Sequence, residues 1–214
     1  SYQPHAYDES DVRLLNTIAA NMSVALENAR LFDETNRLLE ETRQRNAELA
    51  LINAIQQGLA AQLDALAIID LVGDKLREIF GGQNTMIALY HRATNMVNVP
   101  YWVGDNGQRI RPEPLELGTG LTSRVIESRQ PLVLGTAAEG VDLGAVIEDD
   151  GTPEMPESWL GVPIIVGSEV TGAISLQDWP KNRYSDSDVR LLSTLASSMA
   201  VALENARLFA ETNR

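Results

Sequence analysis

A 31-residue sequence that occurs twice in this chain constrains its fold more than any other feature. Residues 7–37 read YDESDVRLLNTIAANMSVALENARLFDETNR, and residues 184–214 read YSDSDVRLLSTLASSMAVALENARLFAETNR, with 23 of the 31 aligned positions identical. A match of this length is an internal repeat. The second copy ends a globular unit, so we expect the first copy to be the last helix of an equivalent unit that precedes it.

Apolar residues recur at alternating spacings of three and four within each copy, which predicts an amphipathic helix. The stripe runs from Leu15 to Phe32 in the first copy and from Leu192 to Phe209 in the second. Its small alanines favour close packing against a sheet or against another helix. Two interpretations follow, the core face of one domain or, in part, a dimer interface formed by Leu15, Ile18, Met22, Leu38, Leu192, Leu195 and Met199.

One long helix is predicted for the N-terminal part of the chain, because no proline or glycine occurs between Tyr7 and Gln57. Its apolar stripe stops at Phe32, so the section that follows must be solvated. Such a helix acts as a semi-rigid spacer or a weakly paired coiled coil that transmits movement between domains. The expected divisions are the last helix of a preceding domain at 1–37, a helical linker at 38–48, a domain at 49–209 and the start of a further linker at 210–214.

Composition excludes several classes of function. Thirty acidic residues against 17 basic ones give a formal charge of −13, and such a surface repels phosphate backbones and anionic lipid headgroups. We therefore expect no nucleic acid partner and no direct membrane contact. The absence of cysteine excludes disulfides, thiolate metal sites and a cysteine-linked chromophore. No apolar run approaches the roughly 20 residues of a membrane span, and a cytoplasmic location is expected.

The remaining sequence predicts an α+β domain. A helix begins after Asp64 and stops at Gly81-Gly82, and strands are expected at 85–91, 97–103, 131–134, 159–166 and 170–177, with a short helix at 121–128. Pro100 makes the second of these strands an edge. Tight turns between strands imply a central antiparallel sheet of five to six strands. The long helices cover one face, while the short helix and loops cover the other and enclose a cavity.

Five segments in this order resemble a GAF domain. They are ELALINAIQQGLAAQLD (48–64), LVGDKLREIFGG (71–82), GTGLTSRVIESRQPLVL (118–134), WLGVPIIVGSEVTGAISLQ (159–177) and RYSDSDVRLLSTLASSMAVALENARLF (183–209). The resemblance implies a PAS-like fold and a small-molecule-binding, dimerising module of signalling proteins. It also makes residues 7–32 similar to the last helix of an upstream GAF domain. Tandem GAF arrays of this style precede histidine kinases, nucleotide cyclases or phosphatases, so we expect a homodimer through the helices and a downstream effector of that kind.

The resemblance says less about the ligand. Cyclic-nucleotide-binding members carry an Asn-Lys pair, then Phe and, after three residues, Asp-Glu; Asn182-Arg183-Tyr184 and Asp188 approximate that pattern, but Val189 stands where Glu belongs. Chromophore-binding members use a cysteine or a haem-ligating histidine, and the only histidine of this domain is His91. Members that reduce methionine sulfoxide work through cysteines. No cofactor and no enzymatic activity are therefore expected, while an unknown small-molecule ligand remains open.

The candidate ligand site lies around the short helix. Gly118-Thr119-Gly120 opens that helix and can aim backbone N–H groups at a carbonyl or phosphate, although turn geometry alone explains the glycines. The aromatic residues beside the predicted cavity can stack on a planar ligand or simply fill the core. The residues expected to bind a ligand are Tyr101, Trp102, Thr119, Gly120, Thr122 and Trp159; no catalytic or metal-binding residue is expected.

Residues 135–157 carry seven acidic and no basic residues, and a loop of this length is either a lid or a flexible insertion. Two functions remain open. The first is a sensor that binds a small molecule under residues 118–157 and relays its state through the flanking helices to an effector. The second is a ligand-free module for dimerisation and signal relay.

Overall fold

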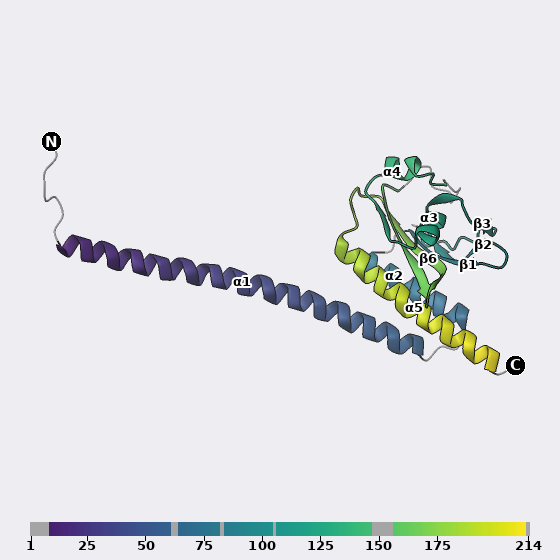
Figure 1. Cartoon of the computed structure of the whole chain (residues 1–214), viewed down its shortest axis with the longest axis horizontal. Coiled ribbons are helices and arrows are strands. Elements are labelled where there is room, and N and C mark those ends of the chain that lie inside the picture. Colours follow the sequence, from purple (N-terminus) through teal and green to yellow (C-terminus); the bar gives the residue numbers. More distant parts are fainter. Residues whose placement is uncertain (1–8, 61–63, 82–83, 105, 147–155, 213–214) are drawn as a thin grey trace. The chain divides into compact units, whose positions relative to one another are not determined.

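The structure is a computed structural model that describes residues 9–60, 64–81, 84–104, 106–146 and 156–212. It divides into two compact units, residues 1–50 and 51–214. Helix α1 (Glu9–Ala60) makes up the described part of the first unit and ends in the second. Figure 1 follows the elements along the chain. The predicted long helix is confirmed, and it continues through Gly58.

The second unit is built on a six-stranded sheet in the order β3-β2-β1-β6-β5-β4, with every neighbouring pair antiparallel. The strands are β1 (Asn84–His91), β2 (Met96–Val103), β3 (Leu115–Glu116), β4 (Leu132–Leu134), β5 (Ser158–Val166) and β6 (Glu169–Asp178). The predicted α+β class and antiparallel sheet are confirmed. Strand β1 is central, as its apolar sequence predicts.

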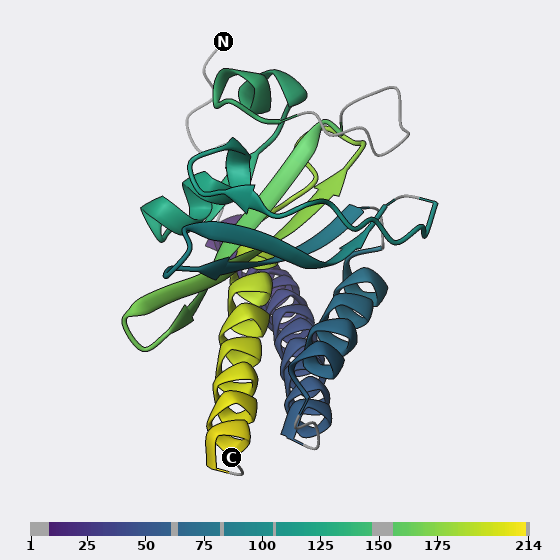
Figure 2. The same cartoon turned by 90° about the vertical axis from the view of Figure 1, so that its right-hand side faces the viewer.

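Helices cover the two faces of the sheet unequally. Figure 2 shows α2 (Ala65–Phe80) and α5 (Asp186–Thr212) on one face, and α3 (Gly120–Ser128) and α4 (Ala137–Asp142) on the other. The larger core lies between α2, α5 and the sheet, and the smaller core lies under α3. Both faces of the sheet are therefore apolar and covered, which is the arrangement expected from the sequence.

Local chemistry fixes where the two long helices of this unit begin and end. Asp64 caps α2 by accepting the Leu66 N–H at 3.2 Å, and Gly81 ends it in the left-handed region at φ 83°. At the start of α5, Asp188 Oδ2 accepts the Ser185 N–H at 2.8 Å and Ser185 Oγ accepts the Asp188 N–H at 3.3 Å. This reciprocal capping satisfies two N–H groups that lack intrahelical partners.

Two elements differ from the sequence prediction. Strand β2 is not the outermost strand, because β3 pairs with its first two residues, Met96 and Val97. Helix α4 lies inside the segment expected to be a lid or insertion, and a capping box between Thr136 and Glu139 starts it. That Thr-x-x-Glu pattern was a readable signal. Residues 147–155 of the acidic segment lie outside the described residues.

The apolar stripe of the repeat has opposite environments in its two copies. On α5, Leu192, Leu195 and Met199 are 0%, 1% and 0% exposed and belong to the larger core. Their assignment to a dimer interface is therefore corrected, since the sheet of their own domain already covers them. On α1, by contrast, the predicted interface residues are 45–60% exposed: Leu15, Ile18, Met22 and Leu38.

Candidate functional site

The sheet face under α3 carries a row of cross-strand neighbours from β2 to β5. Met86 pairs with Trp102 on one side and with Ser175 on the other, and Ser175 pairs with Gly161. This face is opposite the one that packs on α2 and α5, because side chains alternate along a strand and the adjoining Ile87, Ile174 and Leu176 belong to the larger core. Helix α3 packs on β5 and β6 above it.

Ser175 is the unusual member of that row. Its side chain is 1% exposed, and its Oγ has no hydrogen-bond partner among the residues that the structure describes. Leaving a buried hydroxyl unpaired costs about 1–3 kcal/mol. An apolar residue of similar size would avoid this cost, so the Ser175 hydroxyl is a buried polar group that no described residue compensates.

Two tryptophans flank the row. A Cβ atom on Gly161 would lie 2.1 Å from the Trp159 ring, so the indole lies directly across this glycine. Trp102 is held by its Nε1, which donates to Asn84 Oδ1 at 2.7 Å. Both rings are on the α3 side of the sheet and both are buried, and their contact with a ligand stays a prediction.

Tyr101 is on the opposite face. Its hydroxyl donates to Asp74 Oδ1 on α2 at 2.9 Å, and its ring lies where a Cβ on Gly73 would be, 2.4 Å away. The Arg109 guanidinium lies 4.9 Å from the ring centroid, and burial together with the Asp74 hydrogen bond raises the pKa of Tyr101. Tyr101 therefore packs between β2 and α2, and its predicted place beside the two tryptophans was wrong.

The predicted residues at the start of α3 lie together, on the N-terminal turn of that helix. Thr119 is its N-cap but makes no side-chain capping bond; its carbonyl accepts the Ser123 hydroxyl at 2.7 Å. Gly120 has φ 75°, and a Cβ there would lie 3.3 Å from Val146. The adjoining Thr122 is half-buried. This turn therefore lies beside Val146, and the cavity predicted under 118–157 stays a prediction.

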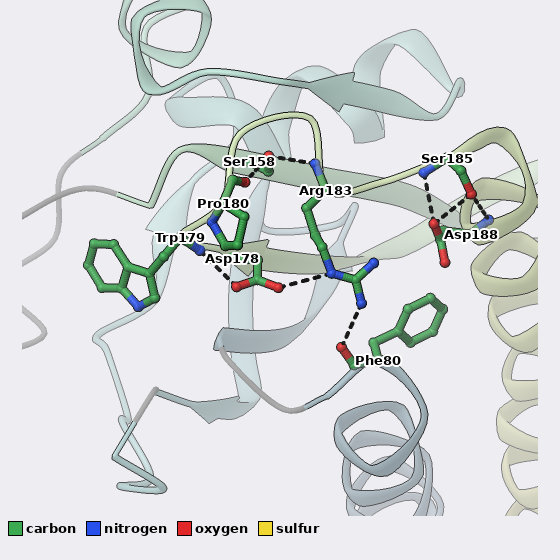
Figure 3. A network of polar contacts seen from close by, with 8 residues as sticks. All are labelled: Phe80, Ser158, Asp178, Trp179, Pro180, Arg183, Ser185 and Asp188. Atoms are coloured by element: carbon green, nitrogen blue, oxygen red, sulfur yellow. Dashed lines mark hydrogen bonds and ion pairs between the residues drawn. The ribbon is translucent and has the colours of Figure 1, made fainter.

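A second cluster joins the end of β6 to the start of α5 (Figure 3). We call residues 178–185 the junction. The buried carboxylate of Asp178 pairs with Arg183 Nε at 3.2 Å and accepts the Trp179 N–H at 2.8 Å. Arg183 Nη2 donates to the Phe80 carbonyl, the last residue of α2, at 3.4 Å. Ser158 Oγ donates to the Pro180 carbonyl at 2.7 Å and accepts the Arg183 N–H at 3.1 Å.

The junction also contacts the segment that leads into α4. The Asn182 N–H donates to the Gly135 carbonyl at 3.0 Å. Lys181 Nζ lies 3.5 Å from Glu157 Oε1, and Glu157 Oε2 accepts the Ala137 N–H at 3.0 Å. The Ala137 hydrogen bond, together with the Lys181 charge, lowers the pKa of Glu157. One short stretch of chain therefore touches β5, α2, α5 and the start of α4.

Sequence reasoning missed the junction. Asn182-Arg183-Tyr184 and Asp188 resemble a cyclic-nucleotide pattern in sequence. In the structure, Arg183 forms an ion pair with Asp178, while Asp188 caps α5. Two further partners of Arg183, Phe80 and Ser158, lie far away along the chain, so periodicity and local spacing carry no signal for them.

Among the described residues, no three His, Asp or Glu side chains lie close enough together to hold a metal ion. His91 is exposed at the end of β1, far along that strand from Met86. No helix in the described part of the chain is both long enough and apolar enough to cross a membrane.

The GAF domain family matches residues 64–203. Solved structures share the fold: the GAF domain of an Acinetobacter phosphoenolpyruvate-protein phosphotransferase is 19% identical with a TM-score of 0.67, covering 76% of this chain and 96% of that one. The free methionine-R-sulfoxide reductase of Neisseria meningitidis is 15% identical with a TM-score of 0.63, covering 76% and 91%. Residues 122 to 287 of a methyl-accepting chemotaxis protein are 19% identical with a TM-score of 0.62, covering 72% and 98%. No curated protein matches the chain. The match over residues 64–203, together with the six-stranded sheet that they form, places this chain in the GAF domain family.

Proposed function

We propose that this chain is a non-catalytic sensory module that binds a small molecule on the α3 side of the sheet and relays the bound state through α5 to an effector. GAF domains are generally sensory or regulatory modules. The observation that carries the proposal is the buried Ser175 hydroxyl without a partner among the described residues, in a row flanked by Trp102 and Trp159. The ligand is expected to be small and largely apolar or planar, with one polar group for Ser175.

A catalytic role is disfavoured by the chain's own chemistry. The sulfoxide reductases with this fold act on free methionine sulfoxide, as their name states. This chain has no cysteine to supply a redox thiol. The second candidate, a ligand-free relay, is favoured by one observation: the Trp159 ring already occupies the space above Gly161.

Native mass spectrometry of freshly purified protein, followed by a thermal-shift screen of metabolites, tests the sensor. A bound compound at a hundredfold excess over its Kd stabilises the fold by about 2.7 kcal/mol. Failure of every compound to stabilise the protein, together with no retained mass, would leave only the ligand-free relay.

Two serine variants sharpen this test. Ser175→Ala removes an unpaired buried hydroxyl, so the free protein is expected to keep or gain stability while ligand-induced stabilisation is lost. Ser123→Ala is the matched control, because Ser123 is equally buried but donates to the Thr119 carbonyl, and its loss costs about 1 kcal/mol. Unchanged ligand stabilisation in Ser175→Ala would remove Ser175 from the site.

The first copy of the repeat supports a tandem arrangement, in which residues 7–37 cover the sheet of another GAF domain. Seven residues of α5 are buried, and five of their seven counterparts on α1 are identical: Leu15, Ala19, Met22, Ala25 and Ala29. The other two pairs are Leu195 with Ile18 and Ala200 with Ser23. The two copies share most of the residues that contact the sheet in α5. The first copy can therefore pack on the same kind of sheet.

For the partners, we propose a homodimer through the helices and a downstream effector such as a histidine kinase, cyclase or phosphatase. The surface available on α5 is its outward side, where Val201 and Leu208 are exposed. The corresponding residues of the first copy, Val24 and Leu31, are exposed as well. The proposed occupant of this outward side is a second copy of this chain, which carries the same exposed apolar residues.

A further inference from the structure

We propose that the junction is a two-armed latch that carries displacement of the segment leading into α4 into the N-terminal turn of α5. One arm holds residues 135–137, and the other holds the last residue of α2. This inference rests on the proposed function, because it names the route by which the α3 and α4 side of the sheet communicates with α5.

The first arm ties the junction to the start of α4 at two points. Asn182 donates its N–H to Gly135, and Glu157 bridges Lys181 to the Ala137 N–H. The approach is close: a Cβ on Gly135 would lie 2.2 Å from Asn182 Oδ1. Movement of residues 135–137 must therefore displace residues 181 and 182.

The second arm ties the junction to the helices on the other face. Arg183 reaches the Phe80 carbonyl at the end of α2 while its Nε pairs with Asp178, and fully buried Ser158 holds the backbone at Pro180 and Arg183. Asn182 adopts the left-handed conformation at φ 52°, and the Ser185 cap of α5 follows only three residues later. So short a connection has little slack to absorb a displacement.

The two arms differ in strength. The side chains of the first ion pair, Lys181 and Glu157, are 62% and 33% exposed, whereas those of the second, Arg183 and Asp178, are 36% and 11% exposed. Exposed pairs are weak and screened by solvent, while breaking a more buried pair is costly. The arm at α4 is therefore the one that opens first, and the arm at α2 keeps α5 attached to the moving chain.

Amide hydrogen exchange on the whole chain tests the latch without any ligand. Glu157→Ala removes the Glu157 bridge between Lys181 and Ala137, and leaves the backbone hydrogen bond from Asn182 to Gly135 in place. We expect exchange of the Ala137 amide to rise, and exchange of the α5 amides at 189–192, beginning with Val189 that donates to Ser185, to rise about fivefold through local opening. Glu169→Ala is the matched control, since it breaks an exposed ion pair with Arg92 at the other end of β6; it is expected to leave α5 unchanged.

A double variant distinguishes a latch from a general loss of stability. In the Ser158→Ala background, the junction backbone is released from β5, so Glu157→Ala should add less than twofold to α5 exchange. Faster exchange at Ala137 with unchanged α5 amides would overturn the proposal, as would equal acceleration throughout β1. Because no ligand is involved, either result leaves the sensor proposal standing, and failure to find a ligand leaves the latch standing.

Discussion

The two copies of the repeat differ in one respect and agree in another. The apolar stripe that faces the sheet in the second copy, called the inward stripe, has opposite exposure in the two copies: Leu15 is 60% exposed on α1, while its counterpart Leu192 is 0% exposed on α5. Their outward sides match: Val24 and Val201 are 61% and 62% exposed, and Leu31 and Leu208 are 49% and 47%. Nearly identical sequence thus presents two apolar sides, of which the sheet covers one in the second copy only.

This comparison separates what periodicity specifies from what the environment specifies. A spacing of three and four residues fixes which side chains share a side of the helix. It does not state whether a sheet or another helix will cover that side. The contacts of α5 therefore identify the inward stripe as the side that packs on a sheet. The outward side is identified by its equal exposure in both copies.

The largest expected contrast is between Leu192→Ala and Leu15→Ala. Truncating a fully buried leucine costs about 2–5 kcal/mol, because it removes apolar contacts and leaves a cavity. The exposed Leu15 is expected to stay within about 0.5 kcal/mol. Urea unfolding of both variants measures the difference. Equal destabilisation would show that the inward stripe of α1 is also buried in solution, and would end the contrast between the copies.

A graft of the first copy into the second asks whether the two stripes are interchangeable. Converting the eight differing positions of 184–214 to their counterparts gives S185D, D186E, S193N, L195I, S197A, S198N, A200S and A210D. Only two of these positions, Leu195 and Ala200, are buried. The domain is expected to fold with a loss of about 1–3 kcal/mol, mostly from the new hydroxyl at position 200. Circular dichroism and thermal unfolding provide the measurement.

Two variants of the graft locate the reason for any loss. Restoring Ala200 alone should recover most of the stability. Failure of the graft to fold even with Ala200 and Leu195 restored would show that the first copy is not adapted to a sheet of this kind, and would contradict the tandem arrangement.

The outward side is tested by association. Val201→Asp with Leu208→Asp places two carboxylates on the proposed interface, and we expect dimer affinity to fall at least about tenfold, equivalent to 1.4 kcal/mol, in sedimentation equilibrium. The exposed positions leave the unfolding midpoint of the domain nearly unchanged. Ala210→Asp, at an exposed position on the opposite side of α5 from Val201, is the control for added negative charge. Affinity unchanged by the double substitution would leave α5 without a dimer role.

The elements of the fold could be predicted from sequence because their signals are local. The Asp64 cap, the Gly81 stop and the Ser185 and Asp188 pair each act within a few residues. Strand alternation also held information that was not used. Tyr101 and Trp102 are adjacent in β2, so only one of them could face α3, and the period of two excluded the pair as a common site.

The rest of the site could not be predicted, because it depends on contacts between distant segments. Ser175 has no distinguishing sequence context, and its significance comes from burial under α3 without a partner among the described residues. Arg183 lies 103 residues from the Phe80 carbonyl that it contacts. Register and burial in three dimensions decide such roles, and a single sequence does not contain them in readable form.

The smallest expected effect concerns the ion pairs that the repeat carries in both copies. Arg207 bonds to Glu204 at 2.7 Å on α5, and the aligned Arg30 lies 3.7 Å from Glu27 on α1. The Arg207 hydrogen bonds lower the pKa of Glu204. A carboxylate with a lowered pKa adds stability above its unfolded pKa of about 4.3, and this contribution is lost as the pH falls through its folded pKa.

Arg207→Gln should therefore raise the Glu204 titration midpoint toward the ordinary glutamate value in an NMR titration, and should flatten the acid side of the stability profile slightly. Arg30→Gln is the matched variant in the other copy. Its pair is longer and its side chains are 73% and 57% exposed, against 55% and 30% for Arg207 and Glu204, so a smaller loss of stability at neutral pH is expected. Equal losses of stability in the two variants would show that the sheet beside α5 adds nothing to the pair, because helix spacing alone would then set both interactions.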